Sequence, residues 1–156
     1  MAVWLARAGR QGEHEQTALD QGIAAIGWLD MPDMGSAQDR EAVTELYRQT
    51  YPDSSTKTMR NHVAQLWAFR GRIQAGDLIV LPLKTQSAIA IGKATGPYQY
   101  RTDLGDSIRH TRPVEWSVTD LPRTSFDQDL LYLFGAFISS VRTNLCPIRC
   151  PSLAIL

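Results

Sequence analysis

Hydrophobic and polar residues alternate with two different periods along this 156-residue chain, and the change of period is clearest near its middle. Between residues 56 and 76, apolar residues such as Val63 and Leu66 recur at helical spacing. Two apolar runs, residues 77–84 and 88–93, follow directly and are separated by a connection of hairpin length. The pattern therefore predicts a helix, a tight turn and a strand pair, and the rest of the chain is organised around this stretch.

Further strands and helices are predicted on both sides of this stretch. The strands cover residues 2–8, 23–28 and 109–118, with a shorter edge segment at 98–101. The helices cover residues 13–21, 39–51 and 126–137, where apolar positions follow a helical period and acidic or capping residues stand at the start. This order is typical of an α+β domain built on a small, mainly antiparallel sheet or partly open barrel.

The last residues, 138–156, differ in character from the rest of the chain. They contain two prolines and two cysteines and show no clean period, which predicts an irregular tail with a short closing strand at 152–156. An apolar strand of this kind can add to its own sheet or to that of a second copy, which would form a dimer. We therefore expect one domain over residues 1–137, followed by the tail.

Charge and composition narrow the classes of partner. Sixteen basic and sixteen acidic residues give a formal net charge of zero, so binding to nucleic acid through a general positive field is disfavoured. Thirteen of the basic residues are Arg and three are Lys. Arginine can grip a phosphate or a base edge at two points, although a GC-rich genome would also produce this excess. No apolar run is long enough for a membrane helix and no signal peptide is visible, so a cytoplasmic location is expected.

Residues for catalysis or metal binding are sparse. Cys146 and Cys150 lack the further ligands that a zinc site needs. His14, His62 and His110 lie far apart in the sequence, and no motif of a known nucleophile, phosphate-binding loop or metalloprotease occurs. We therefore expect a protein that is not an enzyme and that has no metal and no cofactor.

Three features of the pattern can belong to a binding site, and each has a purely structural alternative. Arg60 and Asn61 stand near the start of the central helix, where they can contact a polar ligand or where Asn61 can fasten the preceding loop. Trp28 ends the second predicted strand and is either a core residue or a stacking platform. Arg10 lies in the glycine turn of residues 9–12, which either approaches a ligand or only connects a strand to a helix.

An ordered set of segments resembles a known family. These segments are AVWLARAGRQGEHE, AIGW, TMRN followed by AQLWAFR, GDLIVLP, IAIG and HTRPVEW. Together they resemble the EVE-like branch of the PUA-like superfamily, and in particular the N-terminal recognition region found ahead of Mrr-type restriction endonuclease domains. The resemblance covers about residues 2–137. It implies a PUA-like fold, which is a curved sheet or small barrel flanked by helices, and a pocket for a flipped and often modified nucleobase.

The resemblance also suggests which residues would form that pocket. In related domains, aromatic walls hold the base, and an asparagine or backbone groups contact its edge. The residues that match such base-binding positions are Gly27, Trp28, Thr58, Arg60, Asn61 and Leu83. The residues expected to meet the nucleic-acid backbone are Arg10, Lys57 and Lys84. Residues 82–84 stand where the family has an aromatic wall, and no aromatic residue occurs there.

The resemblance therefore predicts a non-catalytic reader of a flipped, modified DNA base in a restriction or defence context. The alternative on the same fold is a stand-alone regulator that binds RNA or a small ligand. Relatives of the Mrr type continue into a nuclease domain, whereas residues 138–156 do not resemble that continuation. Cleavage would then require a separate nuclease subunit as partner.

Overall fold

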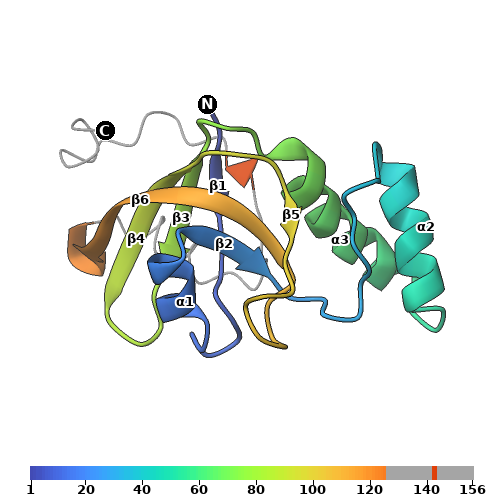
Figure 1. Ribbon diagram of the computed structural model, residues 1–156, viewed down its shortest axis with the longest axis horizontal. Helices are drawn as coiled ribbons and strands as arrows, with labels where there is room; N and C mark the ends of the chain where they lie inside the picture. Colours follow the sequence, from blue (N-terminus) through green and yellow to red (C-terminus); the bar gives the residue numbers. More distant parts are fainter. Residues whose placement is uncertain (126–141, 144–156) are drawn as a thin grey trace.

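The computed structural model describes residues 1–125 and 142–143 of the chain. It consists of a strongly curled open sheet, which forms a half-barrel, and helices that flank it (Figure 1). The strands are β1 (Val3–Leu5), β2 (Ile23–Ile26), β3 (Leu78–Pro82), β4 (Ala88–Ala94), β5 (Gln99–Tyr100), β6 (His110–Pro122) and β7 (Arg142–Thr143). The α-helices are α1 (Glu15–Asp20), α2 (Arg40–Thr50) and α3 (Thr56–Trp67). The predicted α+β class with a curved, mainly antiparallel sheet flanked by helices is confirmed.

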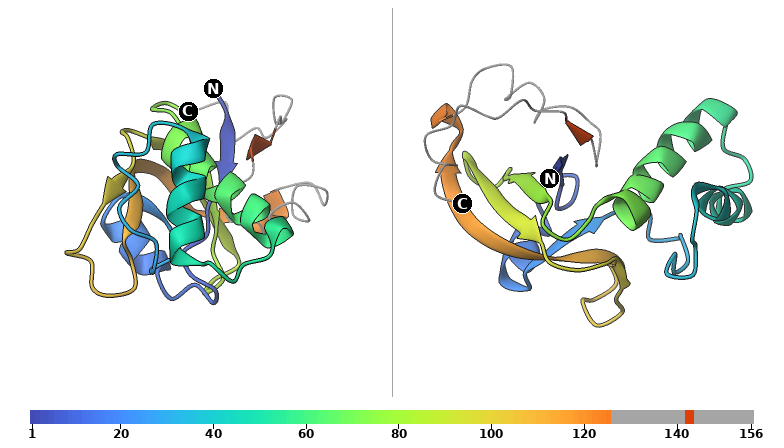
Figure 2. Two further views of the ribbon diagram at one scale, coloured as in Figure 1. Left: turned by 90° about the vertical axis from the view of Figure 1, so that its right-hand side faces the viewer. Right: turned by 90° about the horizontal axis from the view of Figure 1, so that it is seen from above.

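The sheet has the strand order β2-β6-β4-β3-β1-β7, and β5 pairs with β6. Of the pairs in the described residues, only β1 and β3 are parallel. The long strand β6 produces the curl, because it pairs with β2 and β5 near its start and with β4 further along (Figures 1 and 2). Register shifts occur opposite Ile91 and Gly92, and such bulges bend a strand. A Cβ atom on Gly92 would lie 2.5 Å from the carbonyl of Glu115, so only glycine permits this approach.

Helices α2 and α3 form a hairpin to one side of the half-barrel, with α3 between the sheet and α2 (Figures 1 and 2). Each helix begins at a side-chain cap: Asp39 accepts from the amide of Ala42 at 2.8 Å, and Ser55 accepts from that of Thr58 at 3.2 Å. The buried face of each helix, which includes Val43 on α2, joins the main core. The period of the sequence predicts both helices.

Beyond its last residue, α3 continues as a short π-helix, Ala68–Arg72. The guanidinium of Arg112 on β6 donates to the carbonyls of Phe69 at 2.7 Å and Gly96 at 2.9 Å. Arg112 is 2% exposed, and its burial lowers the pKa of the guanidinium to about 10. This side chain therefore ties the end of α3 to the sheet and fixes the hairpin against the half-barrel.

Several expectations for the end of the chain lie outside the described residues. These are the helix at 126–137, the strand at 152–156, and both cysteines. Within the segment expected to be irregular, Arg142–Thr143 forms β7 and pairs antiparallel with β1. In the described part of the chain, no helix is both long and apolar enough to cross a membrane.

Candidate functional site

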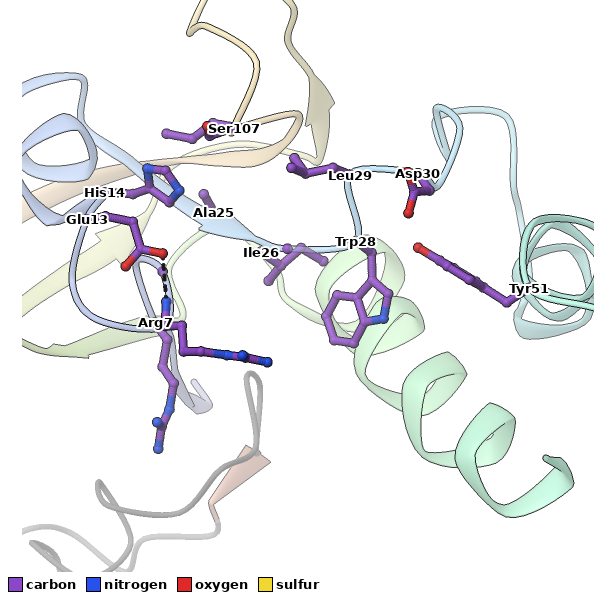
Figure 3. A pocket seen from close by; sticks show the side chains of 14 residues that line it. Arg7, Glu13, His14, Ala25, Ile26, Trp28, Leu29, Asp30, Tyr51 and Ser107 are labelled. Carbon is purple, nitrogen blue, oxygen red and sulfur yellow. Dashed lines mark hydrogen bonds between the residues drawn. The ribbon is translucent and has the colours of Figure 1, made fainter. Parts of the chain in front are cut away.

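A cavity of about 640 Å³ opens beside the end of β2, and we call it the β2 cavity. Its walls come from the β1–α1 loop, the end of β2 with the turn that follows, one residue of α2's C-terminal cap and the loop before β6 (Figure 3). The lining residues are Arg7, Gly9, Arg10, Glu13, His14, Ala25, Ile26, Gly27, Trp28, Leu29, Asp30, Tyr51, Ser107 and Ile108. Cavities of this size suit small organic ligands or single groups of larger ones.

Trp28 lies just after β2, where the half-barrel meets the helical hairpin. Among the described residues it is the only one other than glycine with a positive φ, at 61°. A non-glycine residue in this left-handed region costs about 1–3 kcal/mol, and the surrounding structure must hold it there. In Figure 3 the indole of Trp28 stands between Arg7 on one side and Tyr51 on the other. The backbone turn thus aims a half-buried indole into the cavity instead of continuing the strand.

A buried hydrogen-bond chain holds the backbone of Trp28. Nε2 of His110 lies 3.1 Å from the carbonyl oxygen of Trp28, and Nδ1 lies 2.7 Å from the hydroxyl of Tyr98. The amide of Met34 donates to the same hydroxyl at 3.2 Å. Each partner is satisfied when Tyr98 donates to Nδ1 and Nε2–H donates to Trp28, which requires a neutral imidazole. His110 is 0% exposed, and burial lowers its pKa, in agreement with the neutral form.

Aromatic rings gather on the other side of Trp28. The imidazole of His62 lies 5.4 Å from the indole at an interplanar angle of 70°, and 5.7 Å from the ring of Tyr47. The hydroxyl of Tyr47 lies 2.8 Å from Nδ1 of His62, and its ring lies 4.9 Å from that of Tyr51. These ring contacts, two edge-to-face and one tilted, are favourable and orient the rings. They connect Trp28, which follows β2, to both helices of the hairpin.

The same rings border a second cavity of about 440 Å³ in the hairpin, which we call the α2–α3 cavity. Its lining residues are Trp28, Tyr47, Thr50, Tyr51, Pro52, Asp53, Ser54, Thr58 and His62. Trp28 and Tyr51 belong to both cavities.

Both acidic and basic side chains line the β2 cavity. The carboxylate of Glu13 accepts from the amides of Gln11 at 2.7 Å and Arg10 at 3.1 Å (Figure 3). Backbone hydrogen bonds, including those from its own amide and from Gln11, lower the pKa of Glu13 to about 2. Because the loop amides already bind this internal carboxylate, they do not form an open phosphate site. The side chains of Arg7 and Arg10 line the cavity as cationic groups.

Some of the sequence-predicted residues meet at this site. Gly27, Trp28 and Arg10 line the β2 cavity, and Thr58 lines the α2–α3 cavity beside Trp28. Lys84 is linked to the β2 cavity only indirectly, since its ammonium donates to the carbonyl of Arg10. The structure thus brings the glycine turn and the end of β2 together in one cavity.

Other predicted residues are placed elsewhere. Leu83 is 0% exposed in the core and lines neither cavity. The exposed residues Lys57, Arg60 and Asn61 also line neither cavity. The helix begins at Thr56 under the Ser55 cap, so Asn61 lies in its interior and does not fasten the preceding loop.

The residues that sequence reasoning missed are Arg7, His14, Tyr47, Tyr51 and His62. Helical spacing carries a signal for one of them. Thr58 and His62 are four residues apart and share one face of α3, which is the face toward Trp28. Asn61 is one residue earlier and points about 100° away from His62.

No group of three or more histidine, cysteine, aspartate or glutamate residues within the described ranges could hold a metal ion. Comparison with curated proteins gives no match. Residues 3–130, which include both cavities, match a family described as a domain of unknown function, and the chain therefore belongs to the DUF8426 family.

Proposed function

We propose that this domain is a non-catalytic reader that binds a flipped, modified DNA base in the β2 cavity, with the base against Trp28. The observation that carries the proposal is the backbone of Trp28, which is held in a left-handed conformation by His110 and aims the indole into a cavity. Strained backbone of this kind is often retained where a side chain has a binding task.

The energetics of base flipping are compatible with this site. Extruding a base from a duplex costs a few kcal/mol, and stacking on an aromatic side chain returns about 1–3 kcal/mol. Gly27 is exposed at the cavity, and a Cβ atom at this position would have no atom within 4 Å apart from those of its two chain neighbours. This free space lies next to Trp28 in the chain, so a planar ring can approach the backbone there. The edge of the ring would then meet polar groups such as His14 and Ser107.

The cationic side chains of the cavity give a reason for nucleic acid as the source of the base. Arg7 and Arg10 line the β2 cavity, where phosphates flanking an extruded base would lie. Contacts of this kind position a nucleic acid locally, which is consistent with a net charge of zero for the whole chain. The restriction or defence context and a separate nuclease subunit belong to the proposal through the resemblance of the ordered segments. The cytoplasmic location belongs to it through the sequence pattern of the chain.

Binding measurements with matched variants test the proposal. Duplexes with one modified cytosine or adenine are compared with the unmodified duplex and with single-stranded RNA of the same sequence. We expect a preference for one modified duplex. Trp28→Ala should weaken that binding by about ten- to hundredfold, in line with the loss of stacking. Gly27→Leu should abolish it, because Gly27 lines the cavity next to Trp28 and a larger side chain there would occupy the space of the base.

Asn61→Ala is the matched control, since Asn61 is exposed on α3 and lines neither cavity. This variant should bind each duplex with the same affinity as the wild-type protein. Equal and weak binding to every nucleic acid, or full binding by Gly27→Leu, would show that the domain does not read a base in this cavity.

The second candidate function is a regulator that binds RNA or a free small ligand in the same cavity. The net charge of zero favours the free small ligand, because the chain gains no general attraction to any nucleic acid. Preference for single-stranded RNA or for a free nucleoside over all duplexes, with the same sensitivity to Gly27→Leu, would support this function instead.

A further inference from the structure

The α2–α3 cavity is not used by the proposed base reader, yet it has the composition of a binding site. It lies between the end of α2, the turn that follows and the first half of α3, and it is closed on the sheet side by Trp28. At about 440 Å³ it falls within the range of cavities that hold small ligands.

Aromatic surface dominates its walls. Four of its nine lining residues carry an aromatic ring, namely Trp28, Tyr47, Tyr51 and His62. Tyr47 is 2% exposed and is fixed by hydrogen bonds of its hydroxyl to His62 at 2.8 Å and Ser54 at 3.0 Å. Trp28 and Tyr51 are half-buried, so part of each ring remains open to a ligand. A flat group can therefore stack here against rings that are already oriented.

The charge around this cavity is negative. Asp53 is the one formally charged residue among the nine that line it, with histidine counted as neutral. Asp30, which lines the β2 cavity, lies beside Tyr51 (Figure 3). Burial raises the pKa of Tyr51, and the carboxylate of Asp30 adds to that rise. Arg7 and Arg10 line only the β2 cavity.

The ends of α2 and α3 at this turn do not make the charge around the cavity positive. The cavity touches the C-terminal end of α2 at Thr50 and the N-terminal end of α3 at Thr58. The partial charges of these two ends are opposite and offset each other. The lining of the cavity thus combines ring faces with the carboxylate of Asp53 and, with histidine counted as neutral, contains no cationic side chain.

We propose that the α2–α3 cavity binds a flat, positively charged heteroaromatic ring of the N-alkylated class, stacked on Trp28 and Tyr51 with Asp53 and Asp30 as counter-charges. Ring faces attract such cations through their quadrupole, and the attraction is larger where water is partly excluded. A phosphate group would be repelled by the same carboxylates. This site shares Trp28, Tyr51 and Asp30 with the β2 cavity. Asp53 and Thr58 line only the α2–α3 cavity, so variants of these two residues test the cation site separately from the base reader.

Matched pairs of probes test the charge requirement on the full chain by calorimetry. The first pair is 1-methylnicotinamide, a cation, and nicotinamide, its neutral counterpart. The second pair is 7-methylguanosine and guanosine at pH 6, which separates an alkylated purine from a pyridinium ring. We expect at least one cation to bind about tenfold more tightly than its neutral partner, the gain of a desolvated cation–ring contact.

Variants then assign the binding to this cavity. Asp53→Asn should weaken binding of the cation and reduce its dependence on salt, whereas Asp120→Asn, an exposed aspartate outside both cavities, should not. Thr58→Phe should block the cavity from α3, and Gly27→Leu should leave cation binding intact because it fills only the β2 cavity.

Equal binding of charged and neutral rings in both pairs would overturn the proposal, and so would loss of cation binding in Gly27→Leu. Neither result bears on the binding of duplexes with a modified base to the protein. Conversely, absence of duplex binding would contradict the base reader and leave this cation site standing.

Discussion

His110 and Trp28 form the pair of residues on which the candidate site depends. The imidazole is fully buried and joins the hydroxyl of Tyr98 to the carbonyl of Trp28. The strained φ of Trp28 is compensated by this hydrogen bond, by the amide of Met31, which donates to the same carbonyl at 2.9 Å, and by packing against the core. His110 is therefore a positioning residue for the indole.

Stability should respond to the protonation of His110. Its pKa in the folded protein is lowered by burial below the ordinary value of 6.5, so the unfolded chain binds more protons once the pH falls below about 6.5. The contribution of the neutral imidazole is complete above that pH and is lost as the pH falls through the folded pKa. His110→Gln keeps a donor and an acceptor but does not titrate, and its free energy of unfolding should fall less between pH 7 and pH 5.

Urea unfolding across this pH range measures the difference. One proton taken up only by the unfolded state changes the free energy of unfolding by up to about 1.4 kcal/mol per pH unit. Identical pH dependence of the two proteins would mean that His110 is not the buried neutral group described here.

At the scale of the elements, the carboxylate of Asp77 fastens β1 to β3, its parallel neighbour in the sheet. Asp77 stands just before β3 and accepts from the amide of Ala2 at 2.8 Å, the indole Nε1 of Trp4 at 2.8 Å and the amide of Gln74 at 3.0 Å. Burial pushes the pKa of Asp77 upward, but these hydrogen bonds together hold it below its ordinary value. A short strand without a neighbour in sequence is thus fastened to the central strand pair.

Asp77→Ala should destabilise the protein by about 1–3 kcal/mol, because it leaves buried donors without an acceptor. The lowered pKa also means that this contribution is present above about pH 3.8 and is lost as the pH falls through the folded value. Thermal unfolding of Asp77→Ala beside Asp20→Ala, an exposed aspartate on α1, measures the effect. A change no larger than that of the control would contradict the role of Asp77 as an anchor.

At the scale of the whole molecule, the sequence predicts the elements better than it predicts the site. Periodicity places α2 and the β3–β4 hairpin because each has enough residues to show a pattern. It cannot give the parallel pairing of β1 with β3, since β1 has three residues and its partner lies more than 70 positions away.

The candidate site shows the same limit. The sequence pattern predicts that Gly27 and Trp28 stand at the end of a strand. It cannot predict the left-handed backbone of Trp28, which depends on the distant His110. The sequence places Asn61 near the start of the central helix, facing a ligand. In the structure Asn61 lies inside α3, and the face of the helix that reaches Trp28 carries His62 instead.

Trp28 lies between the half-barrel and the helical hairpin and lines both cavities. Figure 3 shows its indole in the β2 cavity. The indole N–H signals of the four tryptophans can be resolved by ¹H–¹⁵N NMR. They therefore show, for each tryptophan separately, whether a bound base lies beside it. The indole of Trp4 donates to Asp77 at 2.8 Å and that of Trp116 donates to the carbonyl of Ala18 at 3.0 Å, so both serve as internal references.

The decisive titration adds a short duplex with a single modified base to the labelled chain, with each indole signal assigned by a Trp→Phe variant. If the domain reads a base in the β2 cavity, the signal of Trp28 shifts in proportion to bound duplex while those of Trp4 and Trp116 stay in place. A duplex that binds without moving the Trp28 signal would contradict the proposed site.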